Sequence, residues 1–249
     1  MQKWIWICAT IVMMTLSATA APVSVWVDGE SGAVFTGYND VQIPADDGTR
    51  FSLADDLDPE TVWYYRLQLG LDIGRHSIFG LYAPLRVESS GEFDSLVVFK
   101  GKTFNPGDEI TGTYVFNSYR LTYAYRFYEN ESFKLAAGLT GKIRDAYIAL
   151  DDGTQDSERT NLGFVPLIYL SAEWILSPQF SLLLAGDGLA APQGRAEDFQ
   201  LAAVYSPRED LSLRLGYRIL EGGSDGGGSV YTFSMFHYLS AGVRWRYGL

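Results

Sequence analysis

The sequence contains little of the side-chain chemistry on which many enzymes depend. It has one cysteine and two histidines among 249 residues. The cysteine, Cys8, lies inside the N-terminal apolar stretch, so the chain beyond that stretch has no disulfide, no thiolate nucleophile and no cysteine-based metal site. Catalysis by histidine would have to use His76 or His237.

Basic residues are also scarce. The 19 lysines and arginines are outnumbered by 30 aspartates and glutamates, which gives a formal net charge of -11. Binding to nucleic acid depends largely on cationic contacts to phosphates. We therefore expect no nucleic-acid partner.

Long apolar runs are missing as well. The uncharged run from Trp4 to Leu16 is shorter than the roughly 20 residues of a membrane-spanning helix. Lys3 precedes this run, and Ala18-Thr19-Ala20 fits a cleavage site, which is the layout of a secretory signal peptide. We predict that residues 1–20 are removed and that residues 21–249 form one domain; the alternative is an N-terminal membrane anchor.

Apolar and polar residues alternate along most of the remaining chain. In residues 61–74, Trp63, Tyr65, Leu67 and their successors share one face, and Arg66 and Asp72 lie on the other. A strict period of two over about eleven residues is the length of a tilted transmembrane strand.

The same alternation predicts about ten strands in total. The glycine-rich residues 25–43 supply the first strand, near Ala33 to Val41 or slightly earlier. In residues 79–88 we expect Phe79, Leu81 and the alternate residues after them on the lipid face. The nine further segments are 61–74, 79–88, 117–128, 133–148, 163–176, 180–190, 198–206, 211–220 and 230–249.

Short and long connections alternate between these strands. The short ones lie near Arg75, Asn130, Pro178 and Arg208, and the long ones near 44–60, 89–112, 150–161, 191–197 and 221–229. This pattern predicts an all-β fold, a single antiparallel up-and-down transmembrane β-barrel of about ten strands, with 8 to 12 compatible. A secreted β-sandwich is the alternative, but long strands and aromatic residues at the strand ends favour the barrel.

The last strand carries a recognisable motif. Val243, Trp245, Tyr247 and Leu249 share its apolar face. Here the chain resembles the bacterial outer-membrane β-barrel proteins, although it ends in leucine in place of the commoner phenylalanine. The resemblance implies a place in the bacterial outer membrane, with membrane lipid, lipopolysaccharide, periplasmic chaperones and the barrel-assembly machinery as partners. Among small barrels it is similar to OmpA-like structural barrels, OmpW-like channels, omptin proteases and lipid A modifying enzymes alike.

Charged residues occupy the faces predicted to line the interior. A lower layer contains Asp72, Arg126, Lys134, Glu173, Arg214 and Arg244, and a higher layer contains Arg66, Arg120, Asp187, Asp198 and Arg218; Asp28 and Glu30 are further acids of the first strand. Buried charges persist when they are paired, so we expect a mutually satisfied ionic plug. In the lower layer, we expect Glu173 to hold both Arg126 and Lys134. A narrow pore with an anion preference and a polar catalytic pocket are the alternatives.

Catalytic and cofactor motifs are weak. His237 and Ser240 superficially resemble the pair of a lipid A deacylase, but side chains three residues apart on a strand point to opposite faces. The acid-rich loops contain no histidine; they are either a solvated anionic surface or a site for calcium or magnesium. We expect no cofactor and a non-enzymatic structural or adhesive barrel. A narrow channel and a lipid A or peptide directed enzyme are the alternatives.

Overall fold

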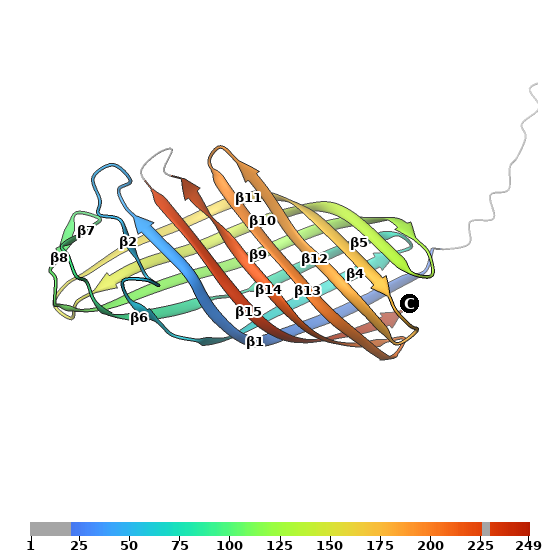
Figure 1. Ribbon diagram of the computed structural model, residues 1–249. Coiled ribbons are helices and arrows are strands. Elements are labelled where there is room, and N and C mark those ends of the chain that lie inside the picture. The colour runs from blue at the N-terminus through green and yellow to red at the C-terminus, as the bar shows by residue number, and fades with distance from the viewer. Residues whose placement is uncertain (1–20, 226–229) are drawn as a thin grey trace, which may run out of the picture.

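A computed structural model describes residues 21–225 and 230–249; the predicted signal peptide lies outside these residues. The described chain forms a closed antiparallel β-barrel of ten strands, in which β5 and β6 continue one another (Figure 1). The predicted fold class is thereby confirmed. The wall consists of β1 (Val23–Gln42), β4 (Val62–Ile73), β5 (His76–Ala83), β6 (Arg86–Glu92), β9 (Glu109–Glu129), β10 (Phe133–Asp151), β11 (Asp156–Ile175), β12 (Phe180–Ala191), β13 (Gly194–Arg208), β14 (Leu211–Asp225) and β15 (Tyr231–Gly248).

No helix in the described part of the chain is long and apolar enough to cross a membrane.

The barrel closes between its first and last strands. β1 pairs with β15 from Ser24↔Gly248 to Gln42↔Tyr231. The first strand is therefore much longer than predicted, because charged and glycine residues replace apolar ones in its first half and hide the alternation. Gly32 allows the close approach to β15, since a Cβ atom at this position would lie 1.9 Å from the carbonyl oxygen of Leu239.

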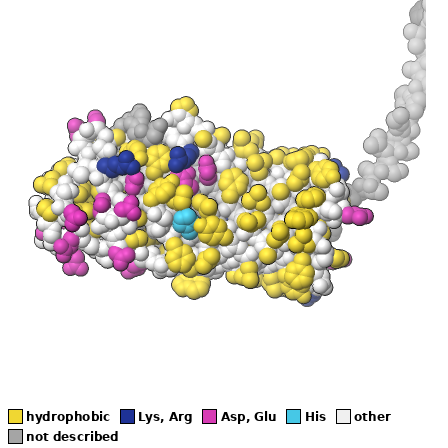
Figure 2. All heavy atoms as spheres, in the orientation of Figure 1, with side chains coloured by type: hydrophobic (Ala, Val, Ile, Leu, Met, Phe, Trp, Pro, Cys, Tyr) yellow, Lys and Arg dark blue, Asp and Glu magenta, His cyan; other side chains and the backbone are white. Residues whose placement is uncertain are grey.

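An apolar belt surrounds the outside of the barrel. Figure 2 shows hydrophobic side chains over the half that contains the C-terminus and acidic side chains gathered at the opposite end. Trp63 is 81% exposed and Leu215 is 70% exposed, as are many alternate residues of the other strands to a smaller degree. Such a belt is typical of the lipid-facing surface of a transmembrane barrel.

The strand formed by β5 and β6 has the opposite orientation to the predicted one. Leu81, Leu85 and Val87 are buried inside the barrel, whereas Ile78 is 47% exposed and the Arg86 side chain 60% exposed. The prediction for 79–88 was wrong because the apolar residues of this strand face the interior: Leu81 lines a cavity there, and Leu85 and Val87 join an apolar core at the acidic end.

This hydrophobic core is built by two long connections. Residues 43–61 contain β2 (Phe51–Ser52) and β3 (Asp58–Pro59), and residues 93–108 contain the hairpin of β7 (Val97–Phe99) and β8 (Lys102–Phe104). The Thr49 amide donates to the Val98 carbonyl at 2.9 Å, and the Lys100 amide donates to the Ile43 carbonyl at 2.9 Å. The core includes Phe51, Leu53, Leu57, Val87, Phe93, Phe99, Phe104, Ile110 and Leu150.

Two other predicted long connections are short turns. β10 and β11 remain paired as far as Asp151↔Asp156, and β12 and β13 remain paired as far as Ala191↔Gly194. These strands extend through segments whose polar residues resemble loop sequence. The predicted connection 221–229 is strand β14 as far as Asp225, and residues 226–229 lie outside the described part. The four predicted short turns are confirmed.

Candidate functional site: the barrel lumen

Eight charged side chains meet in the middle of the lumen. Each is at most 6% exposed, although each carries a formal charge. They come from six strands, on which alternate residues point inward, so residues distant in sequence meet across the barrel. We call this set the central ionic layer; its members are Asp28, Glu30, Arg66, Arg120, Asp187, Asp198, Arg214 and Arg218.

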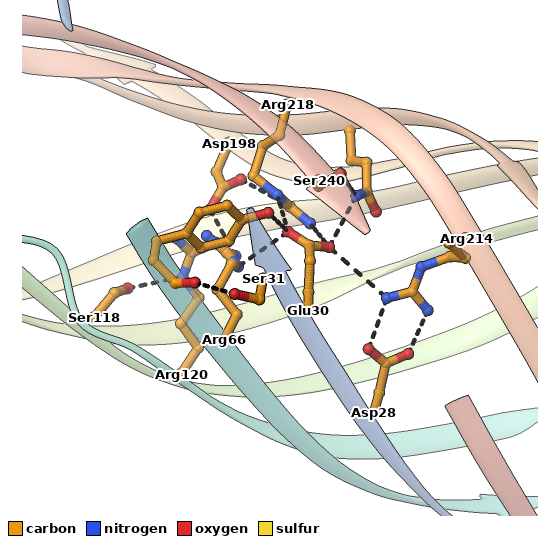
Figure 3. Close-up of polar contacts among 12 residues, drawn as sticks. Asp28, Glu30, Ser31, Arg66, Ser118, Arg120, Asp198, Arg214, Arg218 and Ser240 are labelled. Carbon is orange, nitrogen blue, oxygen red and sulfur yellow. Dashed lines mark hydrogen bonds and ion pairs between the residues drawn. The ribbon is translucent and has the colours of Figure 1, made fainter. Parts of the chain in front are cut away.

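Asp198 joins three strands by accepting from three arginines. Its Oδ2 lies 3.0 Å from Nη2 of Arg66 and 2.6 Å from Nη2 of Arg120, and its Oδ1 lies 2.6 Å from Nη1 of Arg218. Figure 3 shows these guanidinium groups converging on one carboxylate. Charge-assisted bonds of this length are the strong class of hydrogen bond.

Glu30 forms the second centre of the layer. Its Oε1 lies 3.0 Å from Nε of Arg218 and accepts from the Tyr64 hydroxyl at 3.0 Å. Its Oε2 accepts from Nε2 of Gln200 at 2.8 Å and lies 3.7 Å from Nη2 of Arg214. Both carboxylate oxygens are thereby satisfied by neutral donors as well as by charges.

Asp28 and Asp187 complete the layer at its two sides. Asp28 binds Arg214 through both oxygens, with Oδ1 2.6 Å from Nη2, and also lies 2.7 Å from Nε of Arg244. Asp187 accepts from Nη1 of Arg120 at 2.8 Å and from the hydroxyl of Thr140.

Charge is balanced across this cross-section. Four carboxylates face four buried guanidinium groups, and Arg244 is a fifth cation at the partly exposed edge. Buried charges are tolerated when partners and hydrogen bonds compensate for lost hydration. The layer therefore fills the lumen with a neutral, hydrogen-bonded set of side chains.

The remaining residues of the predicted network pair outside this layer. Arg246 lies 3.7 Å from Asp72, and Lys134 lies 3.5 Å from Glu173. Arg126 instead lies 3.3 Å from Glu129 and donates to the Gly74 carbonyl at 2.7 Å.

Glu173 does not bridge Arg126 and Lys134 as expected. Its second partner is Ser181, whose hydroxyl donates to it at 2.7 Å. The cause is a register shift beside the turn: Leu135 pairs with Tyr128, but the next residue, Ala136, pairs with Arg126. The extra residue changes where Arg126 meets β10, and no turn signal in the sequence marks this shift.

The central ionic layer lies between two cavities. The inner cavity, of about 460 Å³, is at the end with the short turns and is lined by Trp26, Asp72, Lys134 and Glu173 among others. The outer cavity, of about 180 Å³, is at the end with the acidic loops; its walls include Tyr114, Phe116, Lys142, Arg144 and Arg159. The sequence did not indicate this second cavity.

The histidines lie on the outside of the barrel. Nδ1 of His237 is 2.5 Å from the Tyr217 hydroxyl, and Nδ1 of His76 is 2.8 Å from the Tyr123 hydroxyl. Ser240 is buried and accepts from Nε2 of Gln200 at 2.8 Å. His237 and Ser240 therefore occupy opposite faces, as the strand period predicts.

The acidic loops form no cation cage in the described chain. No group of three or more histidine, cysteine, aspartate or glutamate side chains among residues 21–225 and 230–249 is arranged to hold a metal ion. In the β10–β11 turn, bonds from the Thr154 hydroxyl and from the backbone amides of Thr154 and Gln155 hold the pKa of Asp152 below its usual value. This carboxylate stabilises its own turn.

The C-terminal strand places its motif outward. Val243, Trp245, Tyr247 and Leu249 are each about half exposed or more, and β15 is held between β1 and β14.

Comparison with known proteins gives only an architectural likeness. No protein-family model matches the chain, and no curated protein matches it. Similar solved structures are outer-membrane barrels. They include Ail, the attachment invasion locus protein of Yersinia pestis (11% identity, 91% of this chain and 99% of that chain, TM-score 0.40). Neisserial surface protein A (15%, 90% and 97%, 0.36) and the Escherichia coli outer membrane protease OmpT (11%, 94% and 99%, 0.47) are similar at the same level.

Proposed function

We propose that this chain is a transmembrane barrel of the bacterial outer membrane, of the OmpA/OmpW-like kind, with a closed lumen and a structural or adhesive role. The central ionic layer carries this proposal. Four acids and four arginines occupy the middle of the lumen and bind one another, so an ion crossing the barrel would have to break these pairs. A closed barrel acts through its outer surface and its loops.

The two ends of the barrel differ in a way that supports an orientation. Four short turns, after β4, β9, β11 and β13, lie at one end with both described chain ends. The two long connections lie at the other end with most acidic side chains and with the β10–β11 and β12–β13 turns (Figures 1 and 2). In outer-membrane barrels the short turns face the periplasm and the long loops face outward. Lipid and lipopolysaccharide would contact the belt, and chaperones and the assembly machinery would read the strand that ends in Trp245, Tyr247 and Leu249.

The outer hydrophobic core also supports a closed barrel. Phe99, Phe104 and Ile110 are fully buried where the two long connections pack together. An apolar core above an ionic layer leaves two barriers in series. A narrow channel remains the alternative, because cavities lie on both sides of the ionic layer.

Conductance in a planar bilayer tests the closed lumen. We expect no steady conductance from the refolded wild-type barrel. Replacing Asp198 and Arg218 together by alanine removes one carboxylate and one guanidinium and keeps the layer neutral. Because the apolar core remains as a second barrier, this variant should still show no steady conductance. Steady wild-type conductance would overturn the closed-lumen proposal.

Surface labelling tests the orientation, and a deletion tests the role. A tag inserted at Asp152 should react on intact cells, whereas a tag at Asn130 should react only after lysis. Cells without the chain should lose detergent resistance or surface attachment while their uptake of small solutes is unchanged. Labelling of Asn130 on intact cells would contradict the orientation.

A further inference from the structure

The outer cavity contains cations that the barrel itself does not neutralise. Lys142 and Arg144 line it from β10, and Arg159 lines it from β11. Among the side chains that the structure describes, no carboxylate lies within ion-pairing distance of any of the three. Lys142 is 2% exposed, so bulk solvent screens its charge little.

The neutral groups around these cations give partial compensation. Nζ of Lys142 lies 4.4 Å from the centre of the Phe116 ring. Nη2 of Arg144 donates to Oδ1 of Asn161 at 2.5 Å, but its Nε is buried without a partner. The central ionic layer cannot supply the missing charge, since its four carboxylates already face four guanidinium groups. An unpaired buried charge is costly, so a site of this kind favours an anion.

The rest of the cavity wall is part polar and part apolar. Asn161 and Ser234 line it, and so does the acid Glu221, which Arg195 binds at 2.8 Å. Phe116, Ile148, Leu220 and Phe236 line it together with Val165. Its volume of about 180 Å³ exceeds that of an apolar cavity of about 150 Å³ that holds benzene. The space therefore fits a ring-sized apolar body with a small charged group attached.

We propose that the outer cavity binds a small organic carboxylate whose apolar body is about the size of a benzene ring. The carboxylate would accept from Lys142 and from the free donors of Arg144, and the body would pack against Phe116 and Phe236. Arginine with a second cation is well suited to a carboxylate, because both oxygens are then satisfied. The proposal does not depend on whether the lumen conducts or on what the outer loops contact.

Benzoate is the probe for this site. Titration calorimetry of the refolded wild-type barrel in detergent should show saturable binding of benzoate. Benzamide has the same body without the charge, and acetate has the charge without the body; each should bind at least about tenfold more weakly. Equal affinity for benzoate and benzamide would overturn the proposal, as would an absence of saturable benzoate binding.

A matched pair of variants locates the binding. Lys142→Met should weaken benzoate binding at least about tenfold, because it removes the buried ammonium and keeps a side chain of similar length. Lys134→Met makes the same change in the inner cavity and should leave the affinity unchanged. Arg144→Gln provides a second test if Lys142→Met does not refold, as judged by β-sheet circular dichroism. Wild-type affinity in the refolded cavity variants would place the bound benzoate elsewhere and overturn the assignment.

Discussion

Among the residues that the structure describes, buried cations have carboxylate partners in the central ionic layer but not in the outer cavity. Arg120 and Lys142 are direct partners across the β9–β10 ladder and both point into the lumen. Arg120 lies within 2.8 Å of Asp187 and 2.6 Å of Asp198, whereas Lys142 has no such carboxylate among the described side chains. These two adjacent cations lie at nearly the same depth. They differ in whether the opposite wall of the barrel places a carboxylate within reach.

The opposite wall changes within a few residues. At the height of the central ionic layer, β1 and β13 present Glu30 and Asp198. Towards the acidic end, β14 and β15 present Leu220, Ser234 and Phe236, and the acid Glu221 there is already bound by Arg195. Pairing in this barrel is therefore set by cross-lumen partners, and a charge on one strand says little about its environment. The comparison predicts opposite consequences for the same substitution in the two regions.

Removing a cation from the central ionic layer should have the largest effect. Arg218→Met leaves Glu30 and Asp198 each short of a partner, and losing one member of a buried ionic set costs about 3 to 5 kcal/mol. The midpoint of urea unfolding in lipid vesicles, followed by tryptophan fluorescence, measures this. Arg208→Met, in the exposed β13–β14 turn, should leave the midpoint unchanged. A wild-type midpoint for Arg218→Met would show that the layer is hydrated and not a sealed set.

A cation placed on the outside should be the next most damaging. Leu215 points into the apolar belt, and arginine at the middle of a lipid-facing surface costs about 2 to 4 kcal/mol. Ser212→Arg is the control on the same strand, because Ser212 lines the roomy inner cavity. Refolding yield into vesicles compares the two. Equal losses would mean that the belt does not face lipid, and the two lumen regions would then need another interpretation.

The sequence predicted the wall of this barrel better than its contents. Alternation placed Leu213, Tyr217 and Trp245 on the outside, and all three are exposed there. It failed at β5–β6, where Leu85 and Val87 face an apolar interior, because a period of two identifies a face but not the side on which that face lies. Phe51 and Phe99 in the long connections were the available signal, since apolar residues in loops need something to pack against.

The charged residues show the same limit. The prediction that the side chains of Arg66, Arg120 and Asp198 point into the barrel was correct, because side-chain direction follows from the period of a strand. Partners were harder to predict, because they depend on the stagger between strands and on local register shifts. The shift beside Ala136 separated Arg126 from Glu173, and no residue pattern announces it.

Removing the cation of Lys142 should raise the free energy of unfolding, whereas removing that of Arg218 should lower it. Lys142→Met replaces a buried ammonium without a carboxylate by an apolar side chain of similar volume, beside Phe116. We expect the urea midpoint to rise, by about 1 to 2 kcal/mol of unfolding free energy, since apolar replacement of buried charge is commonly stabilising. Lys134→Met should not raise it, because Glu173 would lose its partner. A fall in the midpoint of Lys142→Met would show that this cation is compensated inside the barrel.

The smallest effect should come from the pair in the inner cavity. Lys134 and Glu173 lie 3.5 Å apart with side chains 37% and 29% exposed, so water screens both charges. Glu173→Gln should cost at most about 1 kcal/mol, as for a solvated ion pair, and the Ser181 hydroxyl should still find an acceptor. The difference from wild type should shrink in 1 M salt, where the Debye length is about 3 Å, whereas the effect of Arg218→Met should persist. In a Lys134→Met background the glutamine substitution should cost nothing further. A loss as large as that of Arg218→Met would mean that the inner cavity excludes water as well as the central ionic layer does. The two regions would then not differ in hydration.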